Sequence, residues 1–461
     1  MIRHSMAASM RPILHTRSAL IAALSCGMLF TASCDDVLEV TDRDIINPVD
    51  VESAAGAEAV RIGALARLNQ ATSGTESLFL LGGLFADEYR SGDTFIDRQQ
   101  VDQRSMNVRN TFLTTANRNL HRARLSAEQA VDLLQRFRPD APAWQTAEMY
   151  LIQAYTINIA AEHYCNGLVI STVEDGQEVY GEPITVQAAF ERALGHAEDG
   201  LAVNAGASTD ALRVQYALQV ARGRILLNLD RPAEAASAVS GVPTDFRYEM
   251  FHSQTTFSNN MWNWNNLVRR YTVADQEGGN GMPFVSASDP RVPTCQGGDS
   301  VCTTWGITNA NVEDVSGPVY VQLIWPERES PVAILDGIVA RMIEAEAQLR
   351  ANDFGAALAT MNAARATVPG LGDLTDPGTD DARVDLLFRE RAFWLFSRGY
   401  RVGDLRRLVR QYGRAANTIF PTGEWHKGGQ YGTDVTIPLP FEEANNPNIR
   451  DEANLCLDRS A

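Results

Sequence analysis

Two stretches near the end of the chain decide its fold. Residues 388–407 read FRERAFWLFSRGYRVGDLRR, and residues 437–448 read IPLPFEEANNPN. The first stretch places apolar residues at helical spacing among arginines and an aspartate, which predicts a pair of amphipathic helices whose charges form ion pairs inside the fold. In the second stretch each proline fixes φ and removes a backbone donor, which predicts a stiff strand end and a turn. Neither stretch contains a catalytic constellation.

Most of the remaining chain shows the periodicity of paired helices. Apolar residues recur at intervals of three and four, and clusters of Ser, Thr, Asp, Gly or Pro separate the runs. Asp230-Arg-Pro232 marks one boundary, because proline is favoured in the first turn of a helix. The predicted helices span Ala54–Gln70, Leu78–Glu88, Thr114–Phe137, Trp144–Cys165, Val186–Val203, Leu212–Leu229, Ala233–Val239, Leu335–Arg350 and Phe354–Thr367.

The last two predicted helices resemble a tetratricopeptide hairpin. They are joined by a turn at Asn352-Asp353. Small and bulky residues fall where such a hairpin needs them for close helix packing, namely at Ala345, Phe354, Ala357 and Ala364. We therefore predict a mainly α fold in which about four helical hairpins form a curved, tetratricopeptide-like scaffold.

A segment without helical periodicity interrupts this scaffold between about residues 243 and 331. It is rich in Gly, Asn, Thr, Pro and aromatic residues. A long irregular segment inside a compact helical chain is usually either functional or disordered. Its aromatic content argues against disorder. We therefore predict a loop-rich insertion, residues 244–330, that packs on the helical scaffold.

Several motifs resemble, in the right order, those of the SusD/RagB family of outer-membrane nutrient-binding lipoproteins. Leu81–Glu88 resembles the family's helix that ends in an Asp-Glu pair. The C-terminal matches are Arg389-Glu-Arg391, Gly399-Tyr-Arg401, Asp404-Leu-Arg-Arg407, Pro438-Leu-Pro440, Glu443 and Asn446-Pro-Asn448. The resemblance implies a SusD-like scaffold made of residues 34–243 and 331–461, with the insertion 244–330 as the candidate ligand-binding part.

The N-terminus has the pattern of a lipoprotein signal peptide, residues 1–33. It begins with three arginines and no acid, and continues with the apolar run Ser18–Ser33, which is too short to span a bilayer comfortably. Small residues precede Cys34, the expected lipidation site; Cys26 competes, but a shorter apolar run precedes it. Asp35-Asp36 resemble the surface-export signal found beside SusD-like anchors. The expected location is the outer membrane, lipid-anchored and facing the cell surface.

Charge and hydropathy argue against nucleic acid and anionic lipid as partners and against a further membrane span. The formal net charge is −17, which argues against nucleic acid and anionic lipid, because both require basic patches. After the signal peptide, no stretch reaches the roughly 18 consecutive apolar residues of a membrane span.

Four cysteines follow Cys34, and an even number in an exported chain predicts two disulfides. About three connectivities are possible for four cysteines. Cys295 and Cys302 are close enough in sequence to close a local loop, which would leave Cys165 to hold the C-terminal tail through Cys456. A four-cysteine metal site is the alternative, although the chain lacks a CxxC pair.

Enzyme signatures are missing from the sequence. It contains no HExxH, GxSxG, phosphate-binding or GxGxxG motif, and Gly278–Gly281 lies in a loop without the flanking strand and helix of a dinucleotide site. His163, His196, His252 and His426 lack the spacing of metal ligands and are expected to be ordinary surface or core residues. We predict no enzyme activity, no cofactor and no metal.

The insertion's aromatic residues are the main candidates for ligand binding. Sugars present apolar faces that stack on such rings, while Asn side chains can bond their hydroxyls, and residues 262–266 (WNWNN) interleave the two types. Alternatively, the rings pack the insertion onto the helices. The candidate residues are Trp262, Asn263, Trp264, Asn265, Trp305, Tyr320 and Trp325, together with Arg90 and Asp93 from the loop that faces the ligand in SusD-like proteins.

The resemblance implies a lipoprotein that captures oligosaccharides and passes them to a SusC-like TonB-dependent transporter. A peptide-capturing, RagB-like protein is the alternative within the family. A tetratricopeptide scaffold that binds only proteins is a second class, although it needs no aromatic, disulfide-closed insertion. A polysaccharide-degrading enzyme is a third class, and turnover of a bound glycan would reveal it.

Overall fold

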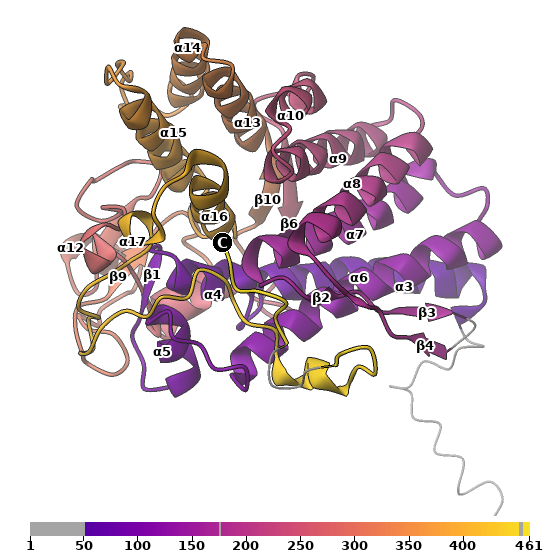
Figure 1. The fold of residues 1–461 in the computed structure, drawn as a ribbon, viewed down its shortest axis with the longest axis horizontal. Helices are drawn as coiled ribbons and strands as arrows, with labels where there is room; N and C mark the ends of the chain where they lie inside the picture. The colour runs from indigo at the N-terminus through magenta and orange to yellow at the C-terminus, as the bar shows by residue number, and fades with distance from the viewer. Residues whose placement is uncertain (1–50, 175–176, 451–454) are drawn as a thin grey trace, which may run out of the picture. The chain divides into compact units, whose positions relative to one another are not determined.

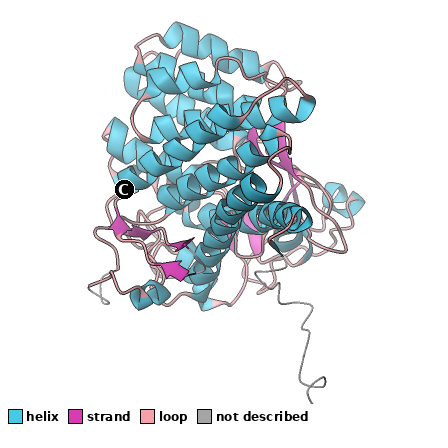
Figure 2. Ribbon diagram, turned by 90° about the vertical axis from the view of Figure 1, so that its right-hand side faces the viewer, coloured by secondary structure: helices cyan, strands magenta, loops and turns pink. Residues whose placement is uncertain are grey.

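Helices dominate the residues that the computed structural model describes, which are 51–174, 177–450 and 455–461 (Figures 1 and 2). The predicted signal peptide and Cys34 lie outside these residues. Among the described helices, none is both long and apolar enough to cross a bilayer. The mainly α fold predicted from the sequence is confirmed.

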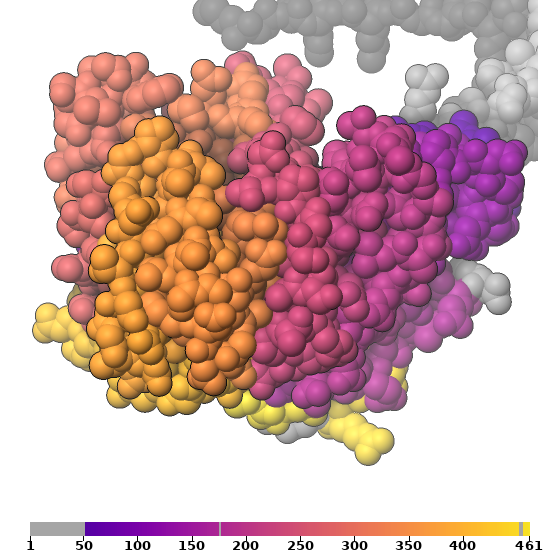
Figure 3. Space-filling model, turned by 90° about the horizontal axis from the view of Figure 1, so that it is seen from above, coloured from indigo at the N-terminus to yellow at the C-terminus, as the bar shows by residue number. Residues whose placement is uncertain are grey.

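The long helices form a row in which neighbours in the chain pack against each other. They are α3 (Ala54–Ser73), α6 (Thr111–Phe137), α7 (Ala143–His163), α8 (Val186–Val203), α9 (Thr209–Asn228), α10 (Pro232–Val239), α13 (Gly337–Arg350) and α14 (Phe354–Arg365). Each packs on the next, from α3 on α6 to α13 on α14. Figure 3 shows this order from above, as bands of colour from purple through magenta to orange. The row is the tetratricopeptide-like scaffold.

Side chains that cap the first turn define where these helices begin. Ser53 Oγ accepts a hydrogen bond from the amide of Gly56 at 3.0 Å, and Thr185 Oγ1 caps α8 at 3.1 Å in the same way. Such caps satisfy amides that have no partner within the helix. Pro232 stands in the first turn of α10, as predicted.

The remaining helices lie mostly between and after the members of the row in the chain. They are α4 (Leu78–Phe85), α5 (Ile96–Asp102), α11 (Asn260–Trp262), the π-helix η1 (Asn263–Leu267), the 3₁₀-helix η2 (Glu277–Gly279), α12 (Ser300–Thr304), α15 (Asp380–Trp394), α16 (Arg401–Tyr412), α17 (Ala416–Ile419) and the 3₁₀-helix η3 (Phe441–Asn445). α15 and α16 are the predicted amphipathic pair. Gly399 between them has φ +70°, and a Cβ there would lie 2.8 Å from the Phe79 ring, so the turn requires glycine.

The strands of the described residues pair two by two and antiparallel. The pairs are β1 (Tyr89–Ser91) with β7 (Tyr271–Val273), β2 (Leu168–Val169) with β5 (Pro183–Ile184), β3 (Thr172–Glu174) with β4 (Gln177–Val179), β6 (Arg247–Met250) with β10 (Val332–Asp336), and β8 (Thr294–Gln296) with β9 (Tyr320–Gln322). Two of these pairs join residues 244–330 to the rest of the chain. β7 pairs with β1, which follows α4, and β6 pairs with β10, which precedes α13.

Two predicted helix boundaries were wrong for the same physical reason. The helix predicted to run to Glu88 ends at Phe85, because Tyr89–Ser91 pairs with β7. The helix predicted from Leu335 begins at Gly337, because Leu335 still belongs to a strand. Asp336 caps that helix by accepting a hydrogen bond from the amide of Val339 at 2.8 Å. Local periodicity does not show a strand partner that lies far away in sequence.

Buried ion pairs join the C-terminal helix pair to the front of the chain. Arg401 of α16 binds the carboxylate of Asp87, which lies between α4 and β1, through Nε at 2.6 Å and Nη2 at 2.7 Å. Asp404 accepts hydrogen bonds from Arg391 and Arg407, each at 2.8 Å. These are the internal ion pairs that the sequence predicted.

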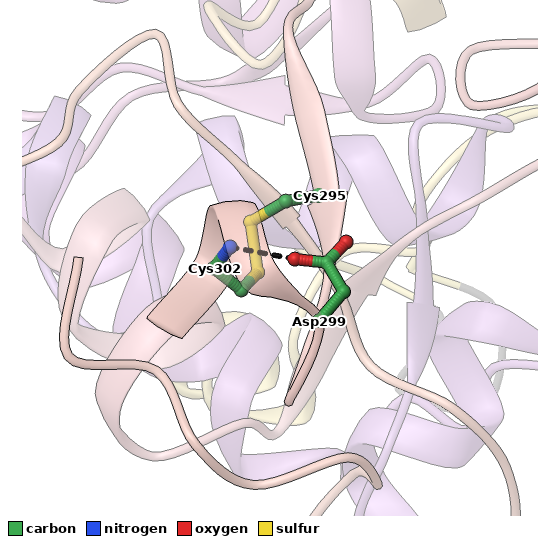
Figure 4. Close-up of side chains that lie close together, drawn as sticks. All are labelled: Cys295, Asp299 and Cys302. Atoms are coloured by element: carbon green, nitrogen blue, oxygen red, sulfur yellow. Dashed lines mark hydrogen bonds between the residues drawn. A yellow bond between two sulfur atoms is a disulfide. The ribbon is translucent and has the colours of Figure 1, made fainter. Parts of the chain in front are cut away.

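All four described cysteines are in disulfides. Cys165 at the end of α7 bonds Cys456 near the C-terminus, and Cys295 of β8 bonds Cys302 of α12. Asp299 lies close to the second disulfide, where its Oδ1 caps α12 by accepting a hydrogen bond from the amide of Cys302 at 2.6 Å (Figure 4). Since both thiols are consumed in the S–S bond, this cluster offers no thiolate to a metal, and the four-cysteine metal site considered from the sequence is wrong.

Candidate ligand-binding site

A cavity of about 140 Å³ lies where β1, β7 and β9 meet. It brings together Arg90 and Tyr320, two residues that were predicted separately from distant parts of the sequence. Its lining consists of Arg90, Ser91, Thr272, Val273, Asp275, Val312, Ser316, Gly317, Pro318, Tyr320 and His426. Residues 244–330 supply most of this lining, and the scaffold supplies the rest.

Strand geometry directs Arg90 toward the cavity. Side chains alternate along a strand, and Tyr89 and Ser91 of β1 are buried while Arg90 is only partly so. The hydroxyl of Tyr89 donates to Ser397 Oγ at 2.9 Å, which ties β1 to the turn before α16. The turn before α16 therefore contacts one face of β1 through Ser397. Arg90 lies on the other face of the strand.

A buried carboxylate positions the guanidinium group of Arg90. Its Nε donates to Glu277, which also accepts a hydrogen bond from the hydroxyl of Tyr431. Burial and the charge of Asp102 raise the pKa of Glu277, whereas the charge of Arg90 opposes this rise. The two Nη atoms of Arg90 donate to no other described residue, so they are available to a ligand.

The opposite wall of the cavity is carried by Tyr320 of β9. Its amide donates to Thr272 Oγ1 at 2.7 Å, which joins β9 to β7. Asn265 bonds both strands, because its Nδ2 donates to the carbonyls of Tyr271 at 2.9 Å and Tyr320 at 3.0 Å, while its Oδ1 accepts from the amide of Gln322 at 2.8 Å. The side-chain amide of Asn265 thus forms its hydrogen bonds within the protein. It stabilises the two strands and is not among the residues that line the cavity.

Asp275 and His426 complete the polar lining, and the sequence analysis did not propose either of them. Asp275 Oδ1 accepts hydrogen bonds from the amides of Val285 and Ser286, at 3.1 and 2.9 Å, which leaves Oδ2 without a partner among the described residues. His426 Nε2 lies 2.7 Å from Asp102 Oδ2. No spacing in the sequence signals either residue; His426 only follows a tryptophan in a glycine-rich loop.

The two tryptophans of the WNWNN stretch lie outside this cavity. Trp264 packs on the core between the guanidinium groups of Arg98 and Arg270, whose carbons lie 5.2 and 5.0 Å from the ring centroid. The guanidinium group of Arg328 lies 5.4 Å from the Trp262 ring. Asn263 Nδ2 donates to Asn260 Oδ1 at 3.3 Å. Asn263 and Asn265 therefore bond within the protein, whereas the buried side-chain polar atoms of Asn266 and Nε1 of Trp264 bond no described residue.

The other proposed residues are scattered. Asp93 is completely buried and binds Arg98, so it supports the turn after β1 rather than lining the cavity. Trp305 is 47% exposed at the end of α12. Trp325 is 4% exposed and lines a different cavity of about 150 Å³ beside Trp394. Of the nine proposed residues, the 140 Å³ cavity contains Arg90 and Tyr320.

The available groups of this cavity suit a ligand that carries hydroxyl groups. Arg90 offers donors, Asp275 offers an acceptor, and Tyr320 offers a ring and a hydroxyl that bonds no described residue. Saccharides present hydroxyls beside apolar ring faces, and both find partners here. Among the described residues around the cavity, no group of His, Cys and carboxylate atoms lies close enough together to hold a metal.

Comparison with known proteins identifies the fold. No protein-family model and no curated protein matches the chain. A SusD superfamily structure from Bacteroides thetaiotaomicron matches with a TM-score of 0.64 at 12% identity, over 87% of this chain and 100% of that one. One from Parabacteroides distasonis gives 0.63 at 13% identity, over 86% and 98%. A SusD-like carbohydrate binding protein from Bacteroides vulgatus gives 0.56 at 12% identity, over 77% and 83%.

Proposed function

We propose that this chain, which has the SusD-like fold, binds an oligosaccharide in the cavity between β1, β7 and β9. Two observations support the proposal: one structure of the same fold is described as a carbohydrate binding protein, and the cavity combines an aromatic ring with unpaired hydrogen-bonding groups. The fold by itself does not define the ligand; the groups that line the cavity do.

The convergence of Arg90 and Tyr320 is the observation that carries the proposal. Arg90 follows the helix of the N-terminal scaffold, and Tyr320 lies in the predicted insertion, yet the pairing of β1 with β7 and the hydrogen bond from Tyr320 to Thr272 bring them to one cavity. We keep the predicted division into a scaffold and a ligand-binding insertion, residues 244–330, as part of the proposal, because that insertion supplies Thr272, Asp275 and Tyr320.

The proposal includes the route that the ligand would take. The signal peptide pattern and Cys34 support an outer-membrane lipoprotein, and we propose that it delivers its ligand to a SusC-like TonB-dependent transporter. We expect binding without turnover. Co-purification of the protein, expressed in its own host, with a transporter barrel tests the partner, and its absence after mild detergent extraction and cross-linking would contradict this part.

A ligand screen tests the binding function itself. The protein, purified in detergent, is titrated calorimetrically with neutral oligosaccharides and with short peptides, and the products are examined for cleavage. Saturable binding of an uncleaved oligosaccharide supports the proposal. Binding of peptides alone would favour a RagB-like peptide carrier, binding of neither would favour the protein-only scaffold, and cleavage would show an enzyme.

A further inference from the structure

A second and larger hollow lies on another part of the molecule. It has a volume of about 350 Å³ and is bounded by α3, α6, the β3–β4 hairpin and the segment that enters η3. It shares no lining residue with the proposed ligand cavity. We call it the α6 groove. A site here is therefore independent of the proposed function.

One face of α6 forms the groove's floor. Residues three and four apart share a helix face, and the lining residues of α6 follow that rule over three turns. They are Thr114, Asn117, Arg118, His121, Arg122 and Leu125, and the buried Arg124 joins them at the edge of this face. Arg67 of α3, which packs on α6, joins them from the side. Arg67, Arg118 and Arg122 thus line the same groove.

These three arginines carry charge that the described part of the protein does not neutralise. Neither Arg67, Arg118 nor Arg122 has a carboxylate of a described residue within ion-pair distance, and all three are exposed. Arg124 beside them is different, because it is buried and its Nη1 donates to Glu128 at 2.6 Å. In a chain with a net charge of −17, three exposed arginines that pair with no described carboxylate form a local basic surface.

Side chains of α6 hold two of the three carboxylates that line the groove. Thr114 Oγ1 donates to Glu442 at 2.9 Å, and Asn117 Nδ2 donates to Glu443 at 2.8 Å. Burial raises the pKa of Glu443. Side chains of α6 thus hold both acids, and neither acid forms an ion pair with Arg67, Arg118 or Arg122.

The β3–β4 hairpin and the residues beside it contribute groups to the groove that suit a sugar ring. Tyr180 lines the groove and is 45% exposed, and its hydroxyl donates to Glu178 at 2.8 Å. Ser171 and Thr172 add hydroxyl groups to the same lining. An aromatic ring beside guanidinium groups can stack a saccharide while the arginines bind its anionic substituent through paired hydrogen bonds.

We propose that the α6 groove is a second binding site, selective for saccharides that carry an anionic group, bound by Arg67, Arg118 and Arg122. The shared chemistry is an oxyanion, which a uronate supplies as a carboxylate and a sulfated sugar supplies as a sulfate ester. Guanidinium groups bind both in the same bidentate manner.

Calorimetric titration of the purified protein tests this site. The probes are a tetragalacturonide, a sulfated chondroitin tetrasaccharide, and maltotetraose as the neutral control. We expect at least one acidic probe to bind, with an affinity that falls as salt rises. We expect the Arg118→Ala/Arg122→Ala variant to weaken that binding about 10-fold or more, since it removes charge-assisted hydrogen bonds. Which acidic probe binds identifies the source of the oxyanion.

Matched variants separate this site from the first cavity. Arg136→Ala removes another exposed arginine of the same helix, and Tyr320→Ala alters the first cavity; neither should change the binding of the acidic probe. Thermal melts establish that each variant is folded. Absence of binding by both acidic probes overturns the proposal, and so does binding that Arg118→Ala/Arg122→Ala leaves unchanged, whereas the proposed function would survive either result.

Discussion

Arg401 and Asp87 are separated by 314 residues and form a two-point ion pair in the protein interior, with Nε–Oδ1 at 2.6 Å and Nη2–Oδ2 at 2.7 Å. Both side chains are buried. Asp87 stands just before β1, the strand that carries Arg90. Arg401 of α16 therefore helps to fix the position of β1, the strand that contributes Arg90 to the proposed ligand cavity.

Removing one partner of this pair should destabilise the whole protein. We expect Arg401→Met to lower the free energy of unfolding by about 3–5 kcal/mol, because a buried carboxylate is left without its counter-charge. Arg383 binds Asp376 with similar two-point geometry, at 2.9 and 2.7 Å, but on the surface. Arg383→Met should cost far less, because water screens this exposed pair. Urea denaturation measures both, and equal losses would contradict the role of the buried pair.

Glu88 should make stability depend on pH. Burial raises its pKa to about 8, so the folded protein holds this side chain protonated at neutral pH. A carboxyl group whose folded-state pKa is raised stabilises fully below its unfolded pKa of about 4.3, and that contribution is lost as pH rises toward 8. Its Oε1 accepts a hydrogen bond from the amide of Ser397 at 2.8 Å, which a glutamine can also accept.

We therefore expect Glu88→Gln to become more stable than the wild type as pH rises. The difference should grow by at most about 1.4 kcal/mol per pH unit between roughly pH 4 and 8. Urea denaturation at pH 5, 7 and 8.5 measures it. A difference that stays constant across this range would show that Glu88 is ionised in the folded protein.

The two disulfides should contribute unequally to stability. Cys165–Cys456 spans 291 residues, whereas Cys295–Cys302 spans 7. In the chain-entropy account a longer closed loop gives more stabilisation, so Cys165→Ser/Cys456→Ser should cost about 2–5 kcal/mol and the local pair less. Thermal melts compare the two double variants. A larger loss for the Cys295→Ser/Cys302→Ser variant would contradict the prediction.

Lipidation at Cys34 should be required for membrane attachment. The expected result is that Cys34→Ala abolishes incorporation of radioactive palmitate and moves the protein out of the membrane fraction. Cys26→Ala is the matched control, and it should leave both unchanged. Labelling that persists in Cys34→Ala and disappears in Cys26→Ala would place the anchor at the earlier cysteine.

Local periodicity was sufficient to predict much of the scaffold. α8 spans Val186–Val203, the predicted range, because its amphipathic pattern and its Thr185 cap are both local signals. The strand β1 was missed because its partner β7 lies about 180 residues away, and nothing within residues 81–91 distinguishes a helix end from a strand start. Sequence patterns indicate local structure more reliably than pairing between distant segments.

The candidate site was only partly predictable for a related reason. Aromatic residues pack cores and bind sugars with the same surface, so the sequence cannot separate Trp264, which packs between two arginines, from Tyr320, which lines a cavity. Asp275 and His426 had no motif around them. They become candidates only when the fold places them beside Arg90.

Calorimetry with the Tyr320→Ala variant tests the central claim most directly. The oligosaccharide that binds best in the ligand screen is titrated into the wild type, into Tyr320→Ala and into Trp305→Ala, which removes an exposed ring of the same insertion outside the cavity. We expect Tyr320→Ala to weaken binding by about 10-fold or more, since a stacked ring and a hydrogen bond are lost, and Trp305→Ala to leave it unchanged. Unchanged affinity in Tyr320→Ala would contradict the assignment of this cavity as the oligosaccharide site.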